Sequence, residues 1–589
     1  MSRLAIIDRE KCINKGGCEF ICGKVCPVNR TGAECIVESE VDKKPNIDET
    51  LCNGCGICTK KCPTQCISII KLPEKLKIDP IHRFGENAFE LFNLPIPKKG
   101  KVVGILGRNG IGKSTALNVL AGTIKPNLGN FKEQPTDEEI IEKYSTTMLG
   151  DYFKKLFSGN MAVSYKPQRI DQIPKQYKGT VIELLTKIDE KNIAKKLLKE
   201  LDMENLVDRD ISKLSGGELQ KVAIIAAASR NADVYYFDEP ASFLDVTTRI
   251  KVAKLIRSLC EDAAVLVVEH DLATLDYISD EIQIVYGEQS AYGIISQSKA
   301  VRRGINEYLD GFLPDDNVRF REYSIKFFQT AAERHVSSGA LLKFPELEKD
   351  FKTFNLKTKE GEVKKSEILA VMGANGLGKS TFLQMLSGKI KPDNGKIEKV
   401  KIAFKEQYPG AIKGTVKEVL MEAAKEKFTS GWYKQVILDK LGLRKLLDNE
   451  VKTLSGGELQ KVHIALTLSK DCDIYAFDEP SAFIDVEDRL IVAEVIKDFV
   501  IKNEVCAIVV DHDVQFIDYI GDSMLVFEGI SGKQGTVYGP VTKKEGMNKV
   551  LEMLDITYRQ DRETKRPRIN KPGSQLDQQQ RSKNNFYYG

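Results

Sequence analysis

The sequence has no apolar run near the roughly 20 residues that a helix needs to cross a bilayer. Its longest strongly apolar runs, such as 263–268, have the length of buried strands. The first ten residues lack an apolar segment too, since four of them are charged, and this argues against a secretory signal. These absences exclude an integral membrane protein and a secreted disulfide scaffold. Hydrophobic residues make up 42% of the chain, which excludes a wholly disordered protein.

Charge of one sign is not in strong excess either. The chain has 88 basic and 84 acidic residues, so its net charge is only +4. This balance is typical of a mixed solvated surface, and a polyanion partner has to be argued from local patches. With 589 residues, at about 150 residues per domain, the chain should hold about four domains.

Cysteine is scarce after residue 70, where only Cys260, Cys472 and Cys506 occur. The other ten of the 13 cysteines lie before it. A segment with that density carries disulfides or binds metal, and the lack of an export signal favours metal.

The second cysteine group, Cys52–Pro63, fits the bacterial ferredoxin run C-x2-C-x2-C-x3-C-P without a mismatch. A tight loop with Gly54 and Gly56 can wrap three thiolates around one iron–sulfur cube, while the turn at Pro63 carries the fourth cysteine to another. The first group, Cys12–Pro27, is looser but ends in the same C-x3-C-P. Zinc sites usually use two C-x2-C pairs instead.

Two such runs predict two 4Fe–4S clusters that exchange their fourth ligands. One cluster is assigned Cys12, Cys18, Cys22 and Cys62, and the other Cys52, Cys55, Cys58 and Cys26. Cys35 and Cys66 remain as spares. No flavin or haem site is recognisable as an electron acceptor, so a structural role is at least as plausible as electron transfer.

The rest of the chain contains one motif series twice. Two segments, Gly107–Ser114 and Gly373–Ser380, fit the phosphate-loop pattern G-x-x-x-x-G-K-[ST], each between a strand-like run and a helix-like run. Loop amides cradle phosphates, the lysine reaches the outer phosphates, and the serine binds Mg²⁺. The candidate ATP-binding residues are Gly107, Asn109, Gly110, Gly112, Lys113, Ser114, Thr115, Gly373, Asn375, Gly376, Gly378, Lys379, Ser380 and Thr381.

Three further motifs recur in the same order. Leu-Ser-Gly-Gly-Glu-Leu-Gln occurs at 214–220 and 454–460, and an apolar strand ends in Asp-Glu-Pro at 238–240 and 478–480. Such a strand places one carboxylate on Mg²⁺ and the next beside an attacking water. A second apolar strand then ends in His270 or His512. Because two of only five histidines occupy these matching places, we expect both to be functional.

The series resembles the ATP-binding cassette (ABC) ATPases from Phe84 to about residue 540. The resemblance implies two cassettes packed head to tail, with each ATP between one phosphate loop and the other cassette's Ser-Gly-Gly-Glu. The resemblance implies that the catalytic residues are Glu239, Glu479, His270 and His512, and that the magnesium ligands are Ser114, Gln168, Asp238, Ser380, Gln407 and Asp478. The signature residues that contact ATP would be Ser215, Gly217, Glu218, Ser455, Gly457 and Glu458. The rings that stack on adenine would be Phe84 and Phe89.

The repeat also locates an insertion. The phosphate-loop lysines lie 266 positions apart but the signature serines only 240, so the first half carries about 26 extra residues. The surplus falls at about 132–157, where the apolar spacing predicts two short amphipathic helices around Ser145–Thr147. The insert is either a neutral decoration or a dock for a partner.

Two connectors are basic. Residues 298–328 contain four arginines, and the stretch after Gly546 runs through several more. These residues are either solvated linker positions or contacts to a phosphate backbone. The polar, glutamine-rich end, 574–589, is expected to be disordered.

The ferredoxin-like head, the insert and the paired hinges closely resemble the ABC-E family of ribosome-recycling ATPases, or RNase L inhibitors. The segments that carry the match are Cys52–Pro63, 82–97, 109–114, 166–174, 304–312 and 566–571. The fold class is α/β: two ABC-type P-loop nucleotide-binding domains in tandem with a small α+β bacterial-ferredoxin-like N-terminal domain. The expected parts are 1–75 (ferredoxin-like), 76–295 (first cassette), 296–328 (hinge), 329–540 (second cassette), 541–573 (second hinge) and the 574–589 tail.

The resemblance implies a cytoplasmic ATPase that splits ribosomes together with a class-I release factor or its rescue paralogue. It would then stay on the small subunit and its rRNA, linking termination to initiation factors; the insert and first hinge are the candidates for rRNA contact. Two alternatives are an ATP-gated electron-transfer protein and a cassette factor of translation or DNA repair. The chain departs from the family in the Cys12–Cys18 gap, which is one residue longer, and in Phe84, which replaces a tyrosine. Phe344 and Phe351 are candidates for the second adenine ring.

Overall fold

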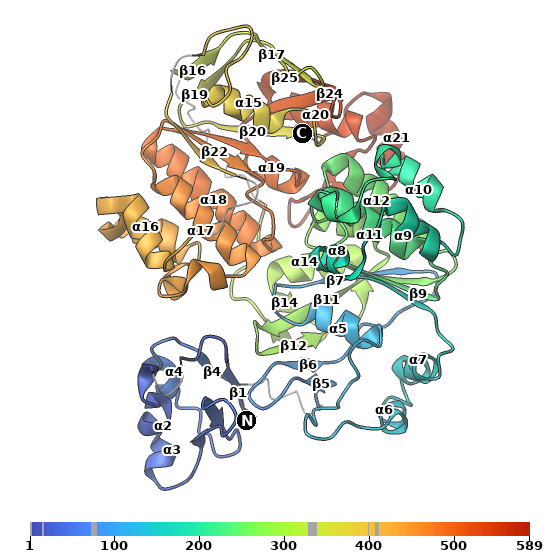
Figure 1. Cartoon of the computed structure of the whole chain (residues 1–589), viewed down its shortest axis with the longest axis vertical. Helices are drawn as coiled ribbons and strands as arrows, with labels where there is room; N and C mark the ends of the chain where they lie inside the picture. Colours follow the sequence, from blue (N-terminus) through green and yellow to red (C-terminus); the bar gives the residue numbers. More distant parts are fainter. Residues whose placement is uncertain are drawn as a thin grey trace.

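The computed structural model describes residues 3–13, 17–71, 79–327, 339–397, 400–406 and 412–588. The chain forms a small N-terminal domain and two larger α/β cassettes (Figure 1). The cassettes face each other, and the N-terminal domain lies beside the β5–β6 edge of the first cassette. No helix of the described residues is both long and apolar enough to span a membrane.

The N-terminal domain is a cysteine-rich α+β unit, as predicted. Its elements are β1 (Arg3–Ile7), α2 (Ile21–Val25), α3 (Pro27–Arg30), β2 (Ile36–Glu38), β3 (Pro45–Ile47), α4 (Ile57–Lys61) and β4 (Ile67–Lys71). β1 pairs with β4 and β2 with β3, both antiparallel. α4 starts at Gly56, which has φ +69°, a conformation that glycine adopts without a steric penalty.

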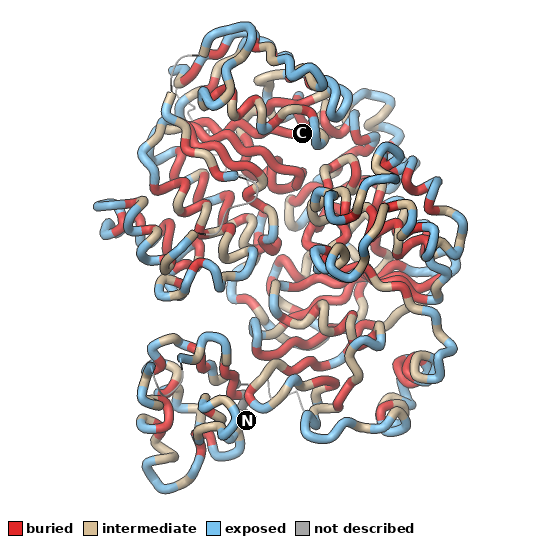
Figure 2. The backbone as a smooth tube through the Cα atoms, in the orientation of Figure 1, coloured by how far each residue is buried: buried red, intermediate tan, exposed pale blue. Residues whose placement is uncertain are grey.

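The first cassette is built on a mixed nine-stranded sheet in the order β5-β6-β12-β11-β7-β10-β9-β8, with β13 paired to β11. Its strands are β5 (His82–Arg83), β6 (Glu90–Phe92), β7 (Val102–Leu106), β8 (Val163–Lys166), β9 (Val234–Asp238), β10 (Ala264–Val268), β11 (Glu281–Glu288), β12 (Tyr292–Ile295) and β13 (Lys299–Ala300). β7, β9 and β10 are parallel and buried along their whole length (Figure 2). Helices cover both faces, which is why these strands read as continuous apolar runs.

The helices of the first cassette follow the motifs. They are α5 (Lys113–Leu120), α8 (Ile173–Gln176), α9 (Val181–Ile188), α10 (Ala194–Glu200), α11 (Gly216–Ala228), α12 (Val246–Leu259) and α13 (Leu272–Ile278). α11 begins with a capping box in which Ser215 and Glu218 satisfy each other's backbone amides. The signature therefore forms the N-terminus of a helix.

The insert forms two helices, α6 (Asp137–Lys143) and α7 (Met148–Phe157), which confirms the prediction from spacing. The buried Tyr152 hydroxyl donates to the Leu120 carbonyl oxygen at 2.6 Å, and Phe153 is fully buried. These contacts fasten α7 to the cassette, while Met148 stays 59% exposed.

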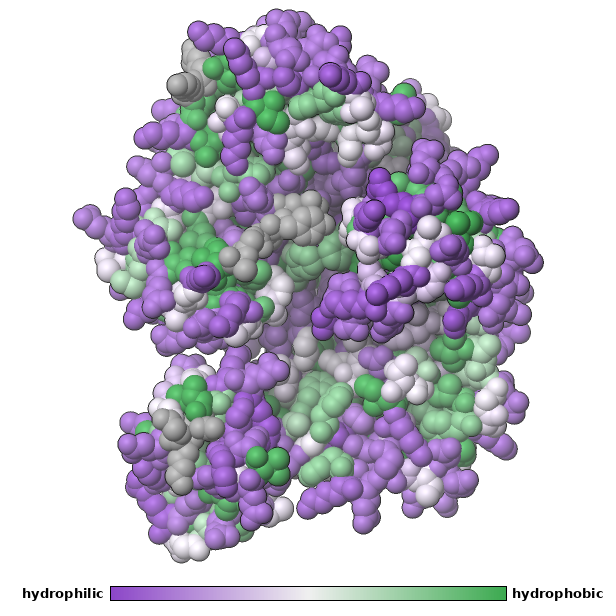
Figure 3. Space-filling view, in the orientation of Figure 1, coloured by the Kyte–Doolittle hydropathy of each residue, from purple (hydrophilic) through white to green (hydrophobic). Residues whose placement is uncertain are grey.

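The second cassette repeats this architecture with an eight-stranded sheet in the order β17-β18-β25-β24-β20-β23-β22-β21. The strands of this sheet are β17 (Leu347–Asp350), β18 (Asn355–Thr358), β20 (Ile368–Gly373), β21 (Ile402–Lys405), β22 (Ile474–Asp478), β23 (Cys506–Val510), β24 (Ser523–Ile530) and β25 (Gln534–Thr542). A separate antiparallel pair is formed by β16 (Ala340–Phe344) and β19 (Gly361–Lys364). Its main helices are α15 (Lys379–Leu386), α16 (Val416–Ala424), α17 (Gly456–Ser469), α18 (Val486–Asn503) and α19 (Val514–Ile520). Hydrophilic side chains cover most of the visible face (Figure 3).

The two connectors pack against each other rather than lying in solvent. The first holds α14 (Val301–Asp310), β14 (Phe312–Leu313) and β15 (Val318–Arg319); the second holds α20 (Lys543–Met553), β26 (Tyr558–Gln560) and β27 (Pro567–Ile569). Arg302 of the first reaches Asp561 and Glu563 of the second, with both nearest N–O distances at 3.0 Å.

Two more hinge arginines, Arg566 and Arg568, pair with Asp276 of α13 at 3.1 and 2.7 Å, and Arg566 is fully buried. The sequence offered two interpretations of these basic residues, solvated linker positions or contacts to a phosphate backbone. Both are wrong for Arg566 and Arg568, because each arginine is paired with an acidic residue of the same chain.

The tail is folded, so the expectation of disorder is wrong. Gln575–Ser582 form α21, which starts at Ser574 and buries Asp577 against the Thr557 hydroxyl at 2.6 Å. Tyr588 then donates to Asp518 at 2.9 Å. The glutamine-rich composition hid a helix cap and two aromatic anchors, Tyr587 and Tyr588.

Candidate nucleotide-binding and iron–sulfur sites

Each phosphate loop is held by its own lysine and contains a glycine at which any other residue would be strained. Lys113 Nζ donates to the Gly107 and Arg108 carbonyl oxygens at 2.9 and 2.6 Å. Gly112 has φ +92°, and a Cβ there would lie 2.6 Å from the Phe89 ring. The loop and the start of α5 line a cavity, as a phosphate-binding helix N-terminus requires.

The second loop has the same construction. Lys379 Nζ donates to the Gly373 and Ala374 carbonyl oxygens, both at 2.8 Å. Gly378 has φ +91° and lies against the Phe354 ring, where a Cβ would approach within 2.9 Å.

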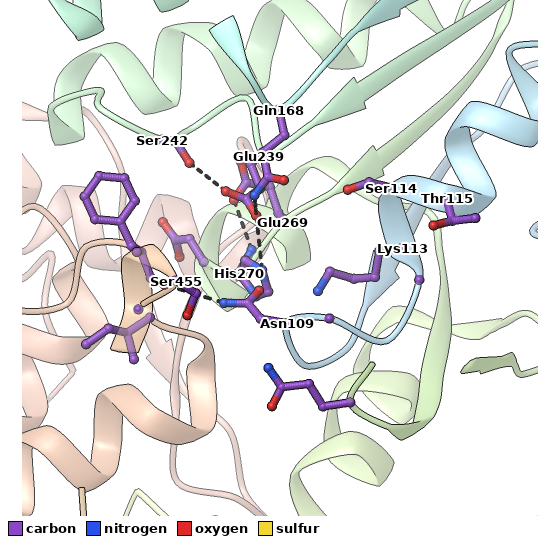
Figure 4. A pocket seen from close by; sticks show the side chains of 18 of the residues that line it. Asn109, Lys113, Ser114, Thr115, Gln168, Glu239, Ser242, Glu269, His270 and Ser455 are labelled. Carbon is purple, nitrogen blue, oxygen red and sulfur yellow. Dashed lines mark hydrogen bonds and ion pairs between the residues drawn. The ribbon is translucent and has the colours of Figure 1, made fainter. Parts of the chain in front are cut away.

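A cavity of about 730 Å³ lies between the first phosphate loop and the signature of the second cassette (Figure 4). In Figure 4 Lys113 extends into the space that separates the first phosphate loop from Ser455. The predicted site residues that line the cavity are Phe84, Phe89, Asn109, Gly110, Gly112, Lys113, Ser114, Thr115, Gln168, Glu239, His270, Ser455 and Gly457. The head-to-tail arrangement expected from the resemblance is thus present at this site.

Asp238 ends β9 with both carboxylate oxygens buried and, among the described residues, without a hydrogen-bond partner. Burial, and next the charge of Glu239, raise the pKa of this carboxyl to about 6. A buried carboxylate needs a compensating charge. Oxygen donors such as those of Asp238, Ser114 and Gln168 are the ligands that Mg²⁺ prefers, so the set fits that ion.

Glu239 lies between Gln168 and His270. Its Oε1 accepts from Gln168 Nε2 at 2.7 Å and lies 3.4 Å from His270 Nε2. Burial alone would raise the pKa of Glu239, but His270, Lys113 and Gln168 together lower it to about 2. Burial, and next Lys113, lower the pKa of His270. At neutral pH the pair is therefore an ionised carboxylate beside a neutral imidazole.

The second site is smaller and is lined by one cassette alone. Its cavity of about 210 Å³ is lined by Asn375, Gly376, Gly378, Lys379, Ser380, Thr381, Asp478 and Glu479, all from the second cassette. Ser380 Oγ donates to Asp478 at 3.1 Å, and His512 Nε2 lies 2.9 Å from Asn375 Oδ1. The opposing Ser215 and Gly217 do not line this cavity, although Ser215 and Glu218 cap α11 as Ser455 and Glu458 cap α17. Gln407 lies outside the described residues.

The cassettes also clasp each other through two aspartates that the sequence reasoning missed. The backbone N–H of Asn375 donates to Asp245 Oδ2 at 3.0 Å, and the backbone N–H of Asn109 donates to Asp485 Oδ2 at 3.4 Å. Between them Phe243 and Phe483 meet with ring centroids 5.5 Å apart. A role for these aspartates could have been predicted from the sequence, because residues 243–246 and 483–486 repeat the same Phe-x-Asp-Val pattern.

The structure separates the candidates for adenine stacking. The Phe84 amide donates to the Phe89 carbonyl oxygen at 3.1 Å, and the Phe351 amide donates to Phe354 in the same way at 2.9 Å. Phe351 and Phe354 are therefore the second-cassette counterparts, and Phe354 was missed. Phe344 is only 2% exposed and packs on Phe382 in the core, so that candidate is wrong.

Most cysteines of the N-terminal domain lie together in its core. Cys12, Cys18, Cys22 and Cys62 line one small cavity. In the other set, burial raises the pKa of the Cys58 thiol to about 11, with further contributions from the neighbouring Cys52, Cys55 and Cys26.

Among the described side chains no three potential ligands converge on a single ion. A four-iron cube does not require that, since each iron takes its own thiolate. The clustered thiols of this domain therefore fit iron–sulfur chemistry better than a mononuclear metal.

The cysteine domain is docked on the loop that carries Phe84 and Phe89. Asn87, in that loop, donates to the Ile47 carbonyl oxygen at 2.9 Å and accepts from the Ile47 amide at 2.7 Å. Arg83 adds an ion pair with Glu49 at 3.2 Å. One short loop thus touches both the first cavity and the cysteine domain.

Comparison with known proteins agrees with this architecture. The ABC transporter family model matches residues 93–242 and 356–482, and the 4Fe-4S binding domain model matches 45–68. An uncharacterized ABC transporter ATP-binding protein of Methanocaldococcus jannaschii is 48% identical over 100% of this chain and 97% of its own length. The translation initiation factor RLI1 of Saccharomyces cerevisiae is 42% identical over 100% and 98%. A solved structure described as a model of ribosome-bound archaeal Pelota and ABCE1 superposes with a TM-score of 0.94, at 48% identity, over 100% of this chain and 99% of that one.

Proposed function

Because the chain belongs to the ABC-E family of twin-cassette iron–sulfur ATPases, which includes ABCE1 and RLI1, we propose that it uses ATP to split ribosomes into subunits. It acts in the cytoplasm after termination or stalling, together with a class-I release factor or its rescue paralogue. It then remains on the small subunit and its rRNA, where it links termination to the initiation factors. This proposal is supported by the similarity to RLI1, a translation initiation factor, and to ABCE1 in a ribosome-bound structure with Pelota.

The observation that carries the proposal is the cavity shared by Lys113 and Ser455. A nucleotide that fills it contacts both cassettes, so its affinity is higher when they are closed. Only such a difference in affinity between open and closed states can move the cassettes. Hydrolysis then removes the contact and allows opening.

Within the first site the residues divide the chemistry. Glu239 orients the attacking water, His270 holds the transferring phosphate, and Lys113 binds the outer phosphates. Glu479, His512 and Lys379 do the same in the second site. Bound Mg²⁺ supplies charge neutralisation on the phosphates, and its proposed ligands are Ser114, Gln168 and Asp238, with Ser380, Gln407 and Asp478 in the second site.

We assign two 4Fe–4S clusters to the cysteine domain, with the two sets of four ligands described above. The clusters stiffen a small domain whose own apolar core is limited to a few residues such as Ala5, Ile36 and Ile47. Asn87 couples this domain to the first nucleotide site, so cassette motion is passed to it as leverage against the release factor and the ribosome.

The experiment is a splitting assay with purified ribosomes, resolved on sucrose gradients. Subunits should appear only when the chain, ATP and a release factor or rescue paralogue are all present. The Glu261→Gln variant, changed at an exposed position in the turn that follows α12, is the matched control and should split as well as the wild type. Monosomes that stay intact under the complete conditions overturn the proposed function.

The electron-transfer alternative is tested with the same protein. ATP turnover should be equal with reduced and oxidised clusters if the cysteine domain serves as a mechanical arm. Turnover that depends strongly on cluster redox state would favour ATP-gated electron transfer instead.

A further inference from the structure

A fifth cysteine lies in the first cluster cavity. Cys66, left as a spare by the ferredoxin spacing, lines the same small cavity as Cys12, Cys18, Cys22 and Cys62. Its side chain belongs to a residue only 4% exposed, and its carbonyl oxygen accepts from the Asp8 amide at 2.8 Å. The backbone is therefore fixed at the start of β4, with the thiol kept from solvent.

The distance between two of the five thiols decides what Cys66 can do. Cys62 Sγ and Cys66 Sγ lie 3.4 Å apart in a hydrogen bond that either atom can donate. Each iron of a four-iron cube takes one thiolate, and thiolates on different irons point away from each other. Two sulfurs this close can reach the same iron but cannot serve two different ones.

The other spare cysteine, Cys35, also lies beside a predicted ligand set. Its thiol interacts with Cys26 and Cys52 of the second set, and its Sγ donates to the Asp48 carbonyl oxygen at 3.8 Å. Cys66 differs in that its contact is to a single predicted ligand, Cys62, in a cavity that all four ligands of the first set line.

We propose that Cys66 is an alternative ligand to Cys62 for one iron of the first cluster; this rests on the proposed ligand assignment. In the exchange the bond from Cys66 Sγ to iron forms as the bond from Cys62 Sγ breaks. The proton of the Cys66 thiol passes to the released Cys62 thiolate along their hydrogen bond. No electron is gained or lost, so no oxidant or reductant is required. The cluster therefore stays four-coordinated by protein when Cys62 is lost.

The test compares full-length variants purified without air, with iron and acid-labile sulfide measured per chain and electron paramagnetic resonance recorded after reduction. The wild type should hold about eight irons. Cys62→Ala should keep that content, with an altered resonance of one cluster, because Cys66 takes the vacant iron. Cys62→Ala/Cys66→Ala should lose about half of the iron, as should Cys22→Ala, which has no second thiol to replace it.

The outcomes separate this exchange from the ligand assignment beneath it. About eight irons in the wild type with half lost in Cys62→Ala alone would overturn the exchange and leave two clusters in place. About four irons in the wild type, unchanged in Cys22→Ala, would overturn both.

A second variant covers the case in which Cys62→Ala disturbs folding. Cys66→Ala keeps all four assigned ligands and should start with full iron content. In the presence of an iron chelator this variant should lose the first cluster several-fold faster than the wild type. The reason is that no second thiol can bind the iron when its bond to Cys62 breaks. Equal rates of loss in the two proteins would show that Cys66 is not a ligand.

Discussion

Arg321 of the first hinge forms a buried ion pair with Glu487 of the second cassette, with Nη1 and Oε2 3.4 Å apart. Both side chains are 6% exposed. Glu487 lies two residues after Asp485, which binds the amide of Asn109 in the first phosphate loop. The matching position in the first cassette is Thr247, which cannot form such a pair. The first nucleotide site is therefore tied to the hinge in a way that the second is not.

This relationship predicts unequal effects of two arginines on the same carboxylate. Arg321→Ala removes the buried charged partner of Glu487 and leaves the Tyr323 hydroxyl as its buried donor, and loss of such a charged partner typically costs about 3–5 kcal/mol. Arg108 lies 3.6 Å from Glu487, but its side chain is half-exposed. Arg108→Ala should therefore lower the free energy of unfolding by less than about 1 kcal/mol. Thermal unfolding should show a fall of several degrees for Arg321→Ala and almost none for Arg108→Ala. Equal losses would contradict a buried and selective pair.

Removing the carboxylate charge of either glutamate proposed to orient the attacking water should slow hydrolysis while leaving nucleotide binding. Because a general base typically contributes 100-fold or more, Glu239→Gln and Glu479→Gln should each reduce turnover of the affected site by at least about 100-fold. The cassettes then stay closed, so sucrose gradients should show both variants retained on small subunits. Release at the wild-type rate would rule out the proposed cycle; Glu261→Gln serves as the control.

Asp276 holds the second hinge against α13 through Arg566 and Arg568. Asp276→Asn leaves the fully buried Arg566 without a charged partner, a loss of about 3–5 kcal/mol. We expect faster amide hydrogen exchange in β26 and β27 and a lower Tm. The exposed Asp262→Asn is the control. Unchanged exchange in the variant would mean that apolar packing alone holds this hinge.

The hinges should also loosen in acid through Asp561. Burial would raise the pKa of this carboxyl, but the amides of Thr564 and Glu563, with Arg566 and Arg302, hold it well below the usual range. A depressed pKa in the folded state adds stability above the unfolded pKa of about 4, and this stability is lost as the pH falls through the folded value. Unfolding measured from pH 6 downward should therefore show a steeper loss below pH 4 for the wild type than for Asp561→Asn. Parallel curves would contradict the assignment.

The repeated motifs allowed the sequence to predict much of the site. Lys113 and Lys379, the aspartate–glutamate strand ends and the two histidines lie where their spacing placed them, because short-range chain geometry sets a phosphate loop or a capped helix. The same holds for the insert, since apolar periodicity alone predicts α6 and α7.

The acidic partners of Arg302, Arg321 and Arg566 could not be predicted from the sequence. They lie 166 to 290 positions away along the chain, and no local pattern distinguishes such an arginine from a solvated one. The same reason explains the tail, whose helix is held by Thr557 and Asp518.

By itself, then, the sequence determined the chemistry of this protein: two phosphate loops, their acids and histidines, and ten clustered thiols. Only the tertiary structure decided which groups act together, namely that Ser455 closes the cavity of Lys113, that Asn87 joins the cysteine domain to the first site, and that Cys66 lies against Cys62. The physical reason is that residue type and local spacing fix what a group can bind. Burial and distance, which depend on the packing of remote segments, fix whether its partner is within reach.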